Sequence, residues 1–186
     1  MSREPLRVIE LLESDEFTGT FGVRTLSKSE ENFNPIGYHT GSAWGWITGL
    51  MACIEFLHKR MGEGFKYLSI LNSVFGRNCL CSLDEAWNAD NADPILLKGS
   101  MYEPSAVFQA WSFGSVIRCI DEYMLGLKVD AINRVITVSA SLKDGMKVFR
   151  RKRVGDDLVD LRVEKLDGEV KVEYVSRKGG NCRIIA

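Results

Sequence analysis

The spacing of apolar residues along the chain changes near residue 126. Before that point, apolar side chains recur every three or four positions, which is typical of helices packed against a core. This spacing predicts about four helices, at residues 5–13, 42–61, 64–76 and 105–125. The 42–61 and 105–125 segments are apolar around most of their circumference, which predicts helices buried between layers.

Residues 127–186 follow a period of two, which is typical of strands. The strand candidates are residues 135–138, 161–165, 169–174 and 182–185. Asp167 and Gly168 separate the second and third candidates, and this pair readily takes the positive φ angles of a tight hairpin turn. We therefore expect a mainly α fold in two regions, a helical region at 1–126 and a small antiparallel β domain at 127–186.

The charges of the two regions differ although the whole chain has a net charge of only −1. Residues 1–126 carry 10 Lys and Arg against 16 Asp and Glu, a net charge of −6, and residues 127–186 carry 14 against 9, a net charge of +5. The basic region includes four consecutive cations, Arg150 to Arg153. No aromatic residues interleave with them, so a solvated or ion-paired face is favoured over a nucleic-acid site, and we expect no nucleic-acid partner.

Other features indicate an intracellular protein. The first residues, MSREPLRVIE, lack a basic segment followed by an apolar one, so we expect no secretion signal. No apolar stretch approaches the roughly 20 residues that span a bilayer, so we expect no membrane partner. The odd number of cysteines favours reduced thiols in the cytoplasm over disulfides. The chain offers no metal-binding spacing, and we expect neither a metal nor a cofactor.

One acidic loop, LDEAWNAD at 83–90, carries the main catalytic candidate, Glu85. Hydrolysis of a glycosidic bond needs two carboxyl groups, one that donates a proton and one that activates water or attacks carbon. Glu85 lies beside Trp87 and close to Asp84 and Asp90, which favours contact with a substrate and a shifted pKa. The alternative is a solvated loop carboxylate without a catalytic role.

Aromatic and amide side chains accompany this loop. Tyr38 and His39 precede a predicted helix, where polar groups can meet a ligand, although His39 alone would suit a structural role equally well. The four tryptophans could stack on sugar faces or fill the core; they are Trp44, Trp46, Trp87 and Trp111. Gln109 lies among apolar residues and needs a hydrogen-bond partner if it is buried, either a ligand hydroxyl or a backbone carbonyl.

Four strings occur in a fixed order: GVRTLS at 22–27, YHTGSAWGW at 38–46, LDEAWNAD at 83–90 and QAWS at 109–112. In sequence and order they resemble the C-terminal portion of glycogen debranching enzymes of the amylo-α-1,6-glucosidase type. The resemblance covers residues 20–125, and the β region is similar to the short segment that follows the helical barrel of those enzymes. It implies an (α/α)6 toroid and inverting hydrolysis of α-1,6-linked glucose in glycogen or branched dextrins.

The resemblance also assigns roles to residues of this chain. It implies that Glu85 is the water-activating base. It implies a branched α-glucan or malto-oligosaccharide as the ligand, held by residues that match the pocket motifs or lie beside the base: Tyr38, His39, Trp44, Trp87, Gln109 and Trp111. The chain departs from the family pattern at Gly45, where the family has proline, and at Asp84, where it has serine.

The general acid of the family has no counterpart motif here, and a complete toroid needs many more helices than these. We therefore expect a partial (α/α)6 toroid of about four helices, inactive alone unless Asp90 or Glu103 serves as the acid. A partner chain could supply the missing helices, or a homo-oligomer could form through the faces of the 42–61 and 105–125 helices. The alternatives are a non-catalytic carbohydrate-binding or structural remnant and, from the basic run, a nucleic-acid binder.

Overall fold

The computed structural model describes residues 4–77, 80–95, 105–106 and 108–186. The chain divides into two compact units, the first formed by residues 1–54 and 62–117 and the second by residues 55–61 and 118–186. Of the described residues, 30% lie in helices and 28% lie in strands, which form four small sheets. The prediction of a mainly α fold with a small β tail is therefore wrong. The protein has a mixed α/β fold, and this finding also overturns the partial (α/α)6 toroid.

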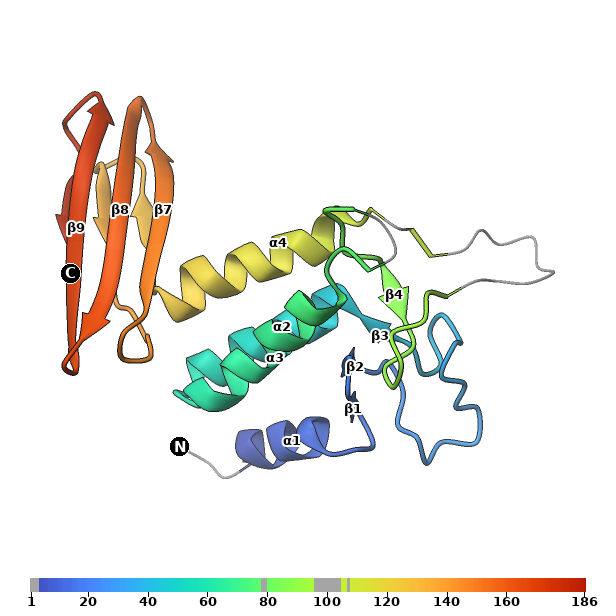
Figure 1. The fold of residues 1–186 in the computed structure, drawn as a ribbon. Coiled ribbons are helices and arrows are strands. Elements are labelled where there is room, and N and C mark those ends of the chain that lie inside the picture. The colour runs from blue at the N-terminus through green and yellow to red at the C-terminus, as the bar shows by residue number, and fades with distance from the viewer. Residues whose placement is uncertain (1–3, 78–79, 96–104, 107) are drawn as a thin grey trace. The chain divides into compact units, whose positions relative to one another are not determined.

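The helices of the described chain agree with the predicted segments in position but not in length (Figure 1). The α-helices are α1 (Glu4–Glu13), α2 (Gly45–Leu57), α3 (Met61–Val74) and α4 (Ala110–Arg118). The first and third correspond to the predicted 5–13 and 64–76 helices. Helix α4 continues as a stretch of π-helix, η1 (Cys119–Met124). Helices α2 and α4 begin later than predicted, because the residues before them form other structures.

The residues before α2 form a strand. Strand β3 (Ala43–Trp44) pairs antiparallel with β4 (Ala86–Trp87), so that Ala43 lies opposite Trp87 and Trp44 lies opposite Ala86. Opposite residues in such a ladder share a face of the sheet, whereas successive residues point to opposite faces. Trp44 and Trp87 therefore point to opposite faces. The apolar pattern of so short a segment fits a helix and a strand equally well, which explains the wrong prediction.

The residues before α4 bond to the acidic loop instead of forming helix. The backbone N–H of Gln109 donates to the Leu83 carbonyl at 3.2 Å, and the Ala106 carbonyl accepts from the Glu85 N–H at 2.7 Å. Within the first unit α4 approaches α2 closely, since a Cβ atom placed on Gly45 would lie 2.5 Å from Ser112 Oγ. These contacts fix the acidic loop against the start of α4.

The core of the first unit gathers around Trp87. Two short strands, β1 (Thr18–Gly19) and β2 (Gly22–Val23), pair antiparallel, and Arg24 then bridges to Ala43 of β3. Trp87 packs in a buried cluster with side chains from α3 and the acidic loop, namely Leu71, Val74, Leu83 and Ala89. This cluster holds the β3–β4 ladder in place.

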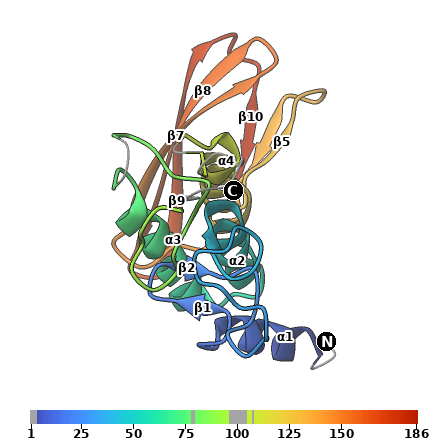
Figure 2. The ribbon, with the colours of Figure 1, turned by 90° about the vertical axis from the view of Figure 1, so that its right-hand side faces the viewer.

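The second unit contains two three-stranded sheets (Figures 1 and 2). One has the order β10-β6-β5 and comprises β5 (Lys128–Asp130), β6 (Val135–Thr137) and β10 (Arg183–Ile185). The other has the order β7-β8-β9 and comprises β7 (Lys147–Val154), β8 (Asp157–Leu166) and β9 (Glu169–Lys178). Strand β10 runs parallel to β6, so the expectation of an entirely antiparallel β unit is wrong for that pair.

The predicted hairpin turn is confirmed. Leu166 pairs with Glu169, and the two residues between them, Asp167 and Gly168, have φ angles of 52° and 82°. Positive φ at both central residues is the requirement of a type I′ turn, which suits the twist of the flanking strands. The sequence pattern and the structure therefore agree on the position of this turn.

The basic run forms the middle of strand β7, which the sequence did not predict as a strand. Arg150 contacts the Asp121 carboxylate of η1 at 2.6 Å, and Lys152 pairs with the same carboxylate. Arg151 faces the other side of the sheet and pairs with Asp160 at 2.6 Å. Three cations of the run are thus ion-paired, as the sequence analysis favoured.

In α2, Met51, Cys53 and Phe56 are buried and Leu57 is exposed. Helix α4 leaves Trp111 and Ile117 exposed. An oligomer joined through these two helices stays a prediction. Within the described ranges, no helix combines the length and the hydropathy that a membrane span requires.

Candidate functional site

Glu85 lies at the entrance to β4, held by its backbone on two sides. Its N–H donates to the Ala106 carbonyl at 2.7 Å, and its own carbonyl accepts from the Gly45 N–H at 3.4 Å. The residue is only 8% exposed. The expectation of a freely solvated loop carboxylate is therefore wrong, and Glu85 has a fixed position between the start of α2 and the start of α4.

Three neutral donors bind the Glu85 carboxylate. The side-chain amide of Gln109 donates to Oε1 at 3.1 Å, and the backbone N–H of Ala106 donates to Oε2 at 3.3 Å. The hydroxyl of Tyr38 also hydrogen-bonds to this carboxylate. Gln109 was expected to meet a ligand hydroxyl or a backbone carbonyl, and the structure gives it the carboxylate instead. None of the three donors carries a charge, so the carboxylate is oriented without being neutralised.

The Tyr38 hydroxyl is affected by this arrangement. Burial, the hydrogen bond to Glu85 and the negative charge of Glu85 together raise the pKa of Tyr38 to about 12. Burial removes the phenolate from water, and the carboxylate would face it as a second negative charge, so both disfavour the charged form. Tyr38 therefore remains a neutral donor at physiological pH.

An aromatic cluster adjoins the carboxylate. The Tyr38 ring meets the Trp44 ring edge to face with centroids 4.6 Å apart, and His39 stacks on Trp44 with centroids 5.5 Å apart. Trp111 continues the cluster at 6.2 Å from Trp44. The Trp44 indole N–H donates to the Tyr38 carbonyl at 2.9 Å, which ties the ring to the segment that carries Tyr38.

The members of the cluster differ in exposure. Trp44 is buried, Tyr38 is half-buried, His39 is exposed, and Trp111 is 51% exposed. Trp111 therefore offers an accessible ring face next to the cluster. Trp46, which the sequence analysis did not assign to the site, lies 6.4 Å from Trp111 by ring centroids. Trp46 is the second residue of α2 and ends the YHTGSAWGW string, and its place in that string is the sequence signal that could have indicated this contact.

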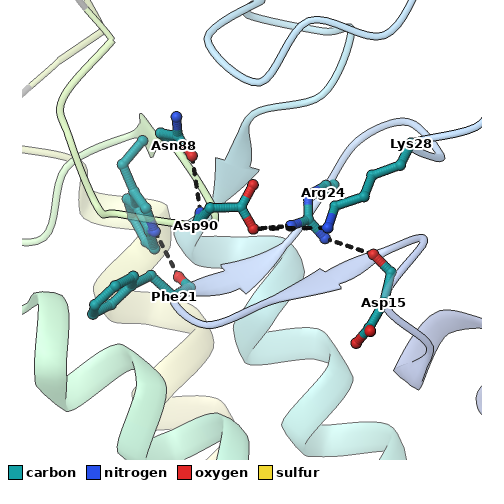
Figure 3. A network of polar contacts seen from close by, with 7 residues as sticks. Asp15, Phe21, Arg24, Lys28, Asn88 and Asp90 are labelled. Atoms are coloured by element: carbon teal, nitrogen blue, oxygen red, sulfur yellow. Dashed lines mark hydrogen bonds and ion pairs between the residues drawn. The ribbon is translucent and has the colours of Figure 1, made fainter.

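Trp87 does not join this group. It is 1% exposed, and its indole N–H donates to the Phe21 carbonyl at 2.6 Å. Figure 3 draws this bond to the labelled Phe21. The structure thus brings together six of the seven residues that the sequence suggested, and it places Trp87 on the opposite face, where neither side of its ring is open to a ligand.

Asp90 has surroundings unlike those of Glu85 (Figure 3). It pairs with Arg24, whose side chain is fully buried and also donates to the Asp15 carbonyl at 3.1 Å. Lys28 lies 4.0 Å from the same carboxylate. The Asp90 carboxylate is therefore committed to a structural ion pair with a buried guanidinium. Glu103, the other residue considered as an acid, lies outside the described residues.

The part of the chain that the structure describes contains no group of three or more His, Cys, Asp or Glu side chains placed to hold a metal ion. Comparison with protein-family models finds no match for this chain, and comparison with curated proteins finds none either. The resemblance to glycogen debranching enzymes therefore rests on the four sequence motifs, and the function is argued from the geometry around Glu85.

Proposed function

We propose that this chain binds the glucose units of a branched α-glucan or malto-oligosaccharide at Glu85 and the adjoining aromatic cluster. The observation that supports this proposal is the convergence of Glu85, Tyr38 and Gln109 beside the exposed ring of Trp111. Sugar rings present hydroxyl groups to polar side chains and apolar C–H faces to aromatic rings. A carboxylate, an amide and a phenol next to an open indole match both requirements.

The carboxylate of Glu85 retains capacity for a ligand. An ionised carboxylate has about four acceptor positions on its two oxygens. Among the described residues, Gln109, Ala106 and Tyr38 occupy three of them, which leaves one for a sugar hydroxyl or a water molecule. With one free acceptor position and a neutral surrounding, Glu85 suits the role of a water-activating base in an inverting α-1,6-glucosidase.

We further propose that the chain alone does not hydrolyse glycosidic bonds. Inverting enzymes place a general acid roughly 6.5–9.5 Å from the base, and the nearby candidate Asp90 is committed to Arg24. A partner chain or a second copy would have to supply the acid. Thiols that form no disulfide within the described residues, Cys81 and Cys182 among them, support a reducing compartment, and we assign the chain to the cytoplasm.

Indole N–H resonances test the binding proposal. The chain has four tryptophans, and the structure separates Trp87 from the other three. Titration with maltotriose or isomaltose should shift the resonance of Trp111 and, to a smaller extent, that of Trp44, whereas Trp87 serves as an internal control that does not move. The proposal fails if no indole resonance moves at millimolar sugar, or if all four move equally.

Glucose release from a branched limit dextrin tests the proposal on catalysis. We expect no turnover by the pure chain above the level of a Glu85→Gln variant. Robust turnover that disappears in this variant would show that the chain contains its own general acid, and the proposed dependence on a partner would then be wrong.

A further inference from the structure

Strand β9 is an edge of the β7-β8-β9 sheet, and in the described chain no other strand pairs with its outer side. It spans ten residues, Glu169–Lys178, and every residue except Val172 is exposed. A long exposed edge presents a row of unpaired N–H and C=O groups that can accept another strand. The backbone of β9 therefore offers a site for strand addition.

The two edges of this sheet differ in charge. Strand β7, at the other edge, carries four consecutive cations, and a second copy of β7 placed beside it would bring cation against cation. Strand β9 instead alternates charged and apolar residues, and its charges have both signs. Only the β9 edge is thus suited to pair with a copy of itself.

Three of the four apolar residues of β9 lie on one face. In the β8–β9 register, Val172 lies opposite Val163 and Tyr174 lies opposite Leu161, both of which are buried. Opposite residues of an antiparallel pair share a face. The β9 stripe of Val170, Val172 and Tyr174 therefore continues the buried face of β8, yet Tyr174 is 52% exposed.

One antiparallel register pairs β9 with a second copy of itself without a conflict of charge. If Val172 lies opposite Val172 of the second copy, Lys171 lies opposite Glu173 of that copy and Glu173 lies opposite its Lys171. On the other face of the strand, Val170 then lies opposite Tyr174 of the second copy. Lys171 and Glu173 thus meet opposite charges and each apolar residue of the stripe meets another apolar residue, while Glu169 lies opposite Val175 at each end of the paired segment.

The neighbouring registers lack this match. Centring the pair on Lys171 places lysine against lysine, and centring it on Glu173 places glutamate against glutamate. Centring it on Tyr174 places Lys171 against Arg177. Centring it on Val175 pairs Glu173 with Arg177 but places Val172 of the apolar stripe against Lys178. Like charges in directly opposite positions destabilise a ladder.

We propose that two copies of this chain pair antiparallel along β9, centred on Val172, and so join their three-stranded sheets into one continuous sheet. The second copy supplies the backbone hydrogen bonds that β9 lacks and covers the exposed stripe. This interface lies in the second unit and is independent of the sugar site at Glu85, so the two proposals fail separately.

Charge-swapped variants test the register. Sedimentation equilibrium of the wild-type chain at micromolar concentration should show a dimer. Lys171→Glu alone, and Glu173→Lys alone, should each weaken the dimer at least tenfold, because both cross-strand pairs then become like-charged. An equimolar mixture of the two variants should dimerise again, because the Lys171→Glu copy presents two carboxylates to the two ammonium groups of the Glu173→Lys copy.

The mixture also controls for folding, since a variant that merely misfolds would not recover its affinity when mixed with the other. The double variant Lys171→Glu/Glu173→Lys should dimerise like the wild type. A monomer at 100 µM, as a rough upper working concentration, would overturn the proposal. A wild-type dimer that both single variants leave unchanged would also overturn it.

Cross-linking distinguishes the register from its competitor. Under mild oxidation Val172→Cys should form a symmetric disulfide-linked dimer, because antiparallel opposite residues bring their Cβ atoms within roughly 4.5–5.5 Å. Val175→Cys, three residues further along the strand, is the matched control and should cross-link much more slowly. The reverse order of rates would contradict the register centred on Val172.

Discussion

Glu85 and Asp90 belong to one loop, and their surroundings give them opposite properties. Glu85 is buried, and within the described part of the chain its hydrogen bonds come from neutral groups, namely Tyr38, Gln109 and the Ala106 N–H. Asp90 is 48% exposed in its side chain, yet it is paired with the buried Arg24. Exposure alone would suggest Asp90 as the reactive group. Their binding partners suggest Glu85 instead. The Asp90 carboxylate is already bound to the Arg24 guanidinium, whereas the neutral donors around Glu85 leave its carboxylate available to a ligand.

The largest effect expected from this comparison concerns stability. Asp90→Asn should lower the free energy of unfolding by about 2–3 kcal/mol, because it leaves the buried Arg24 guanidinium without its counter-charge. Urea denaturation at neutral pH measures the change. Lys28→Gln is the control, since Lys28 is exposed and 4.0 Å from the same carboxylate, and it should cost less than about 0.5 kcal/mol. Equal costs for the two variants would contradict the structural role of Arg24.

Glu85→Gln should show the opposite pattern. The amide has the shape of the carboxylate and its partners are neutral, so we expect a loss of less than about 1 kcal/mol in the free energy of unfolding. Because the charged acceptor for a sugar hydroxyl is removed, maltotriose binding should weaken about tenfold, which corresponds to about 1.4 kcal/mol. Calorimetric titration of Glu85→Gln and of Asp90→Asn with maltotriose measures the sugar affinity of each variant. If Asp90→Asn loses the sugar and Glu85→Gln keeps it, the assignment of roles is reversed.

The smallest effect concerns pH. The pKa of Tyr38 is raised to about 12, so the stability that its neutral hydroxyl contributes is fully present below about pH 10, the usual value for an unfolded tyrosine. That contribution is lost as the pH rises from about 10 through 12. The free energy of unfolding of the wild type should therefore fall more steeply across this window than that of Tyr38→Phe. Phenolate absorbance gives a direct check. The tyrosine titration that is present in the wild type and absent from Tyr38→Phe should lie near pH 12. A midpoint near pH 10 would be inconsistent with the contact between Tyr38 and Glu85.

The comparison also shows what the sequence could and could not establish about the fold. The Asp167-Gly168 turn was predictable, because that residue pair specifies a local backbone conformation. Strand β7 was not, because its inner positions are Arg150 and Lys152 and an alternation of apolar and polar residues is missing there. These two cations can be partly buried because both form ion pairs with Asp121, which is far away in the sequence.

The same limit applies to the candidate site. Motif order suggested that Glu85, Gln109 and Tyr38 act together, and the structure places them in contact. Motif order could not reveal that residues 86–87 form a strand, and the direction of the Trp87 side chain depends on that strand. Nor could it separate Glu85 from Asp90, because the difference between them lies in Arg24, more than sixty residues earlier.

The cationic edge strand β7 has a consequence for the growth of assemblies. A sheet with two receptive edges can add copies without limit and form fibres. Here, two chains joined along β9 would expose only β7 edges at both ends, and each end carries Arg150 to Arg153. Further addition would be opposed by repulsion that salt screens, since the Debye length falls from about 10 Å at 0.1 M to about 3 Å at 1 M ionic strength. The cations of β7 would thus limit the assembly to two copies at low ionic strength.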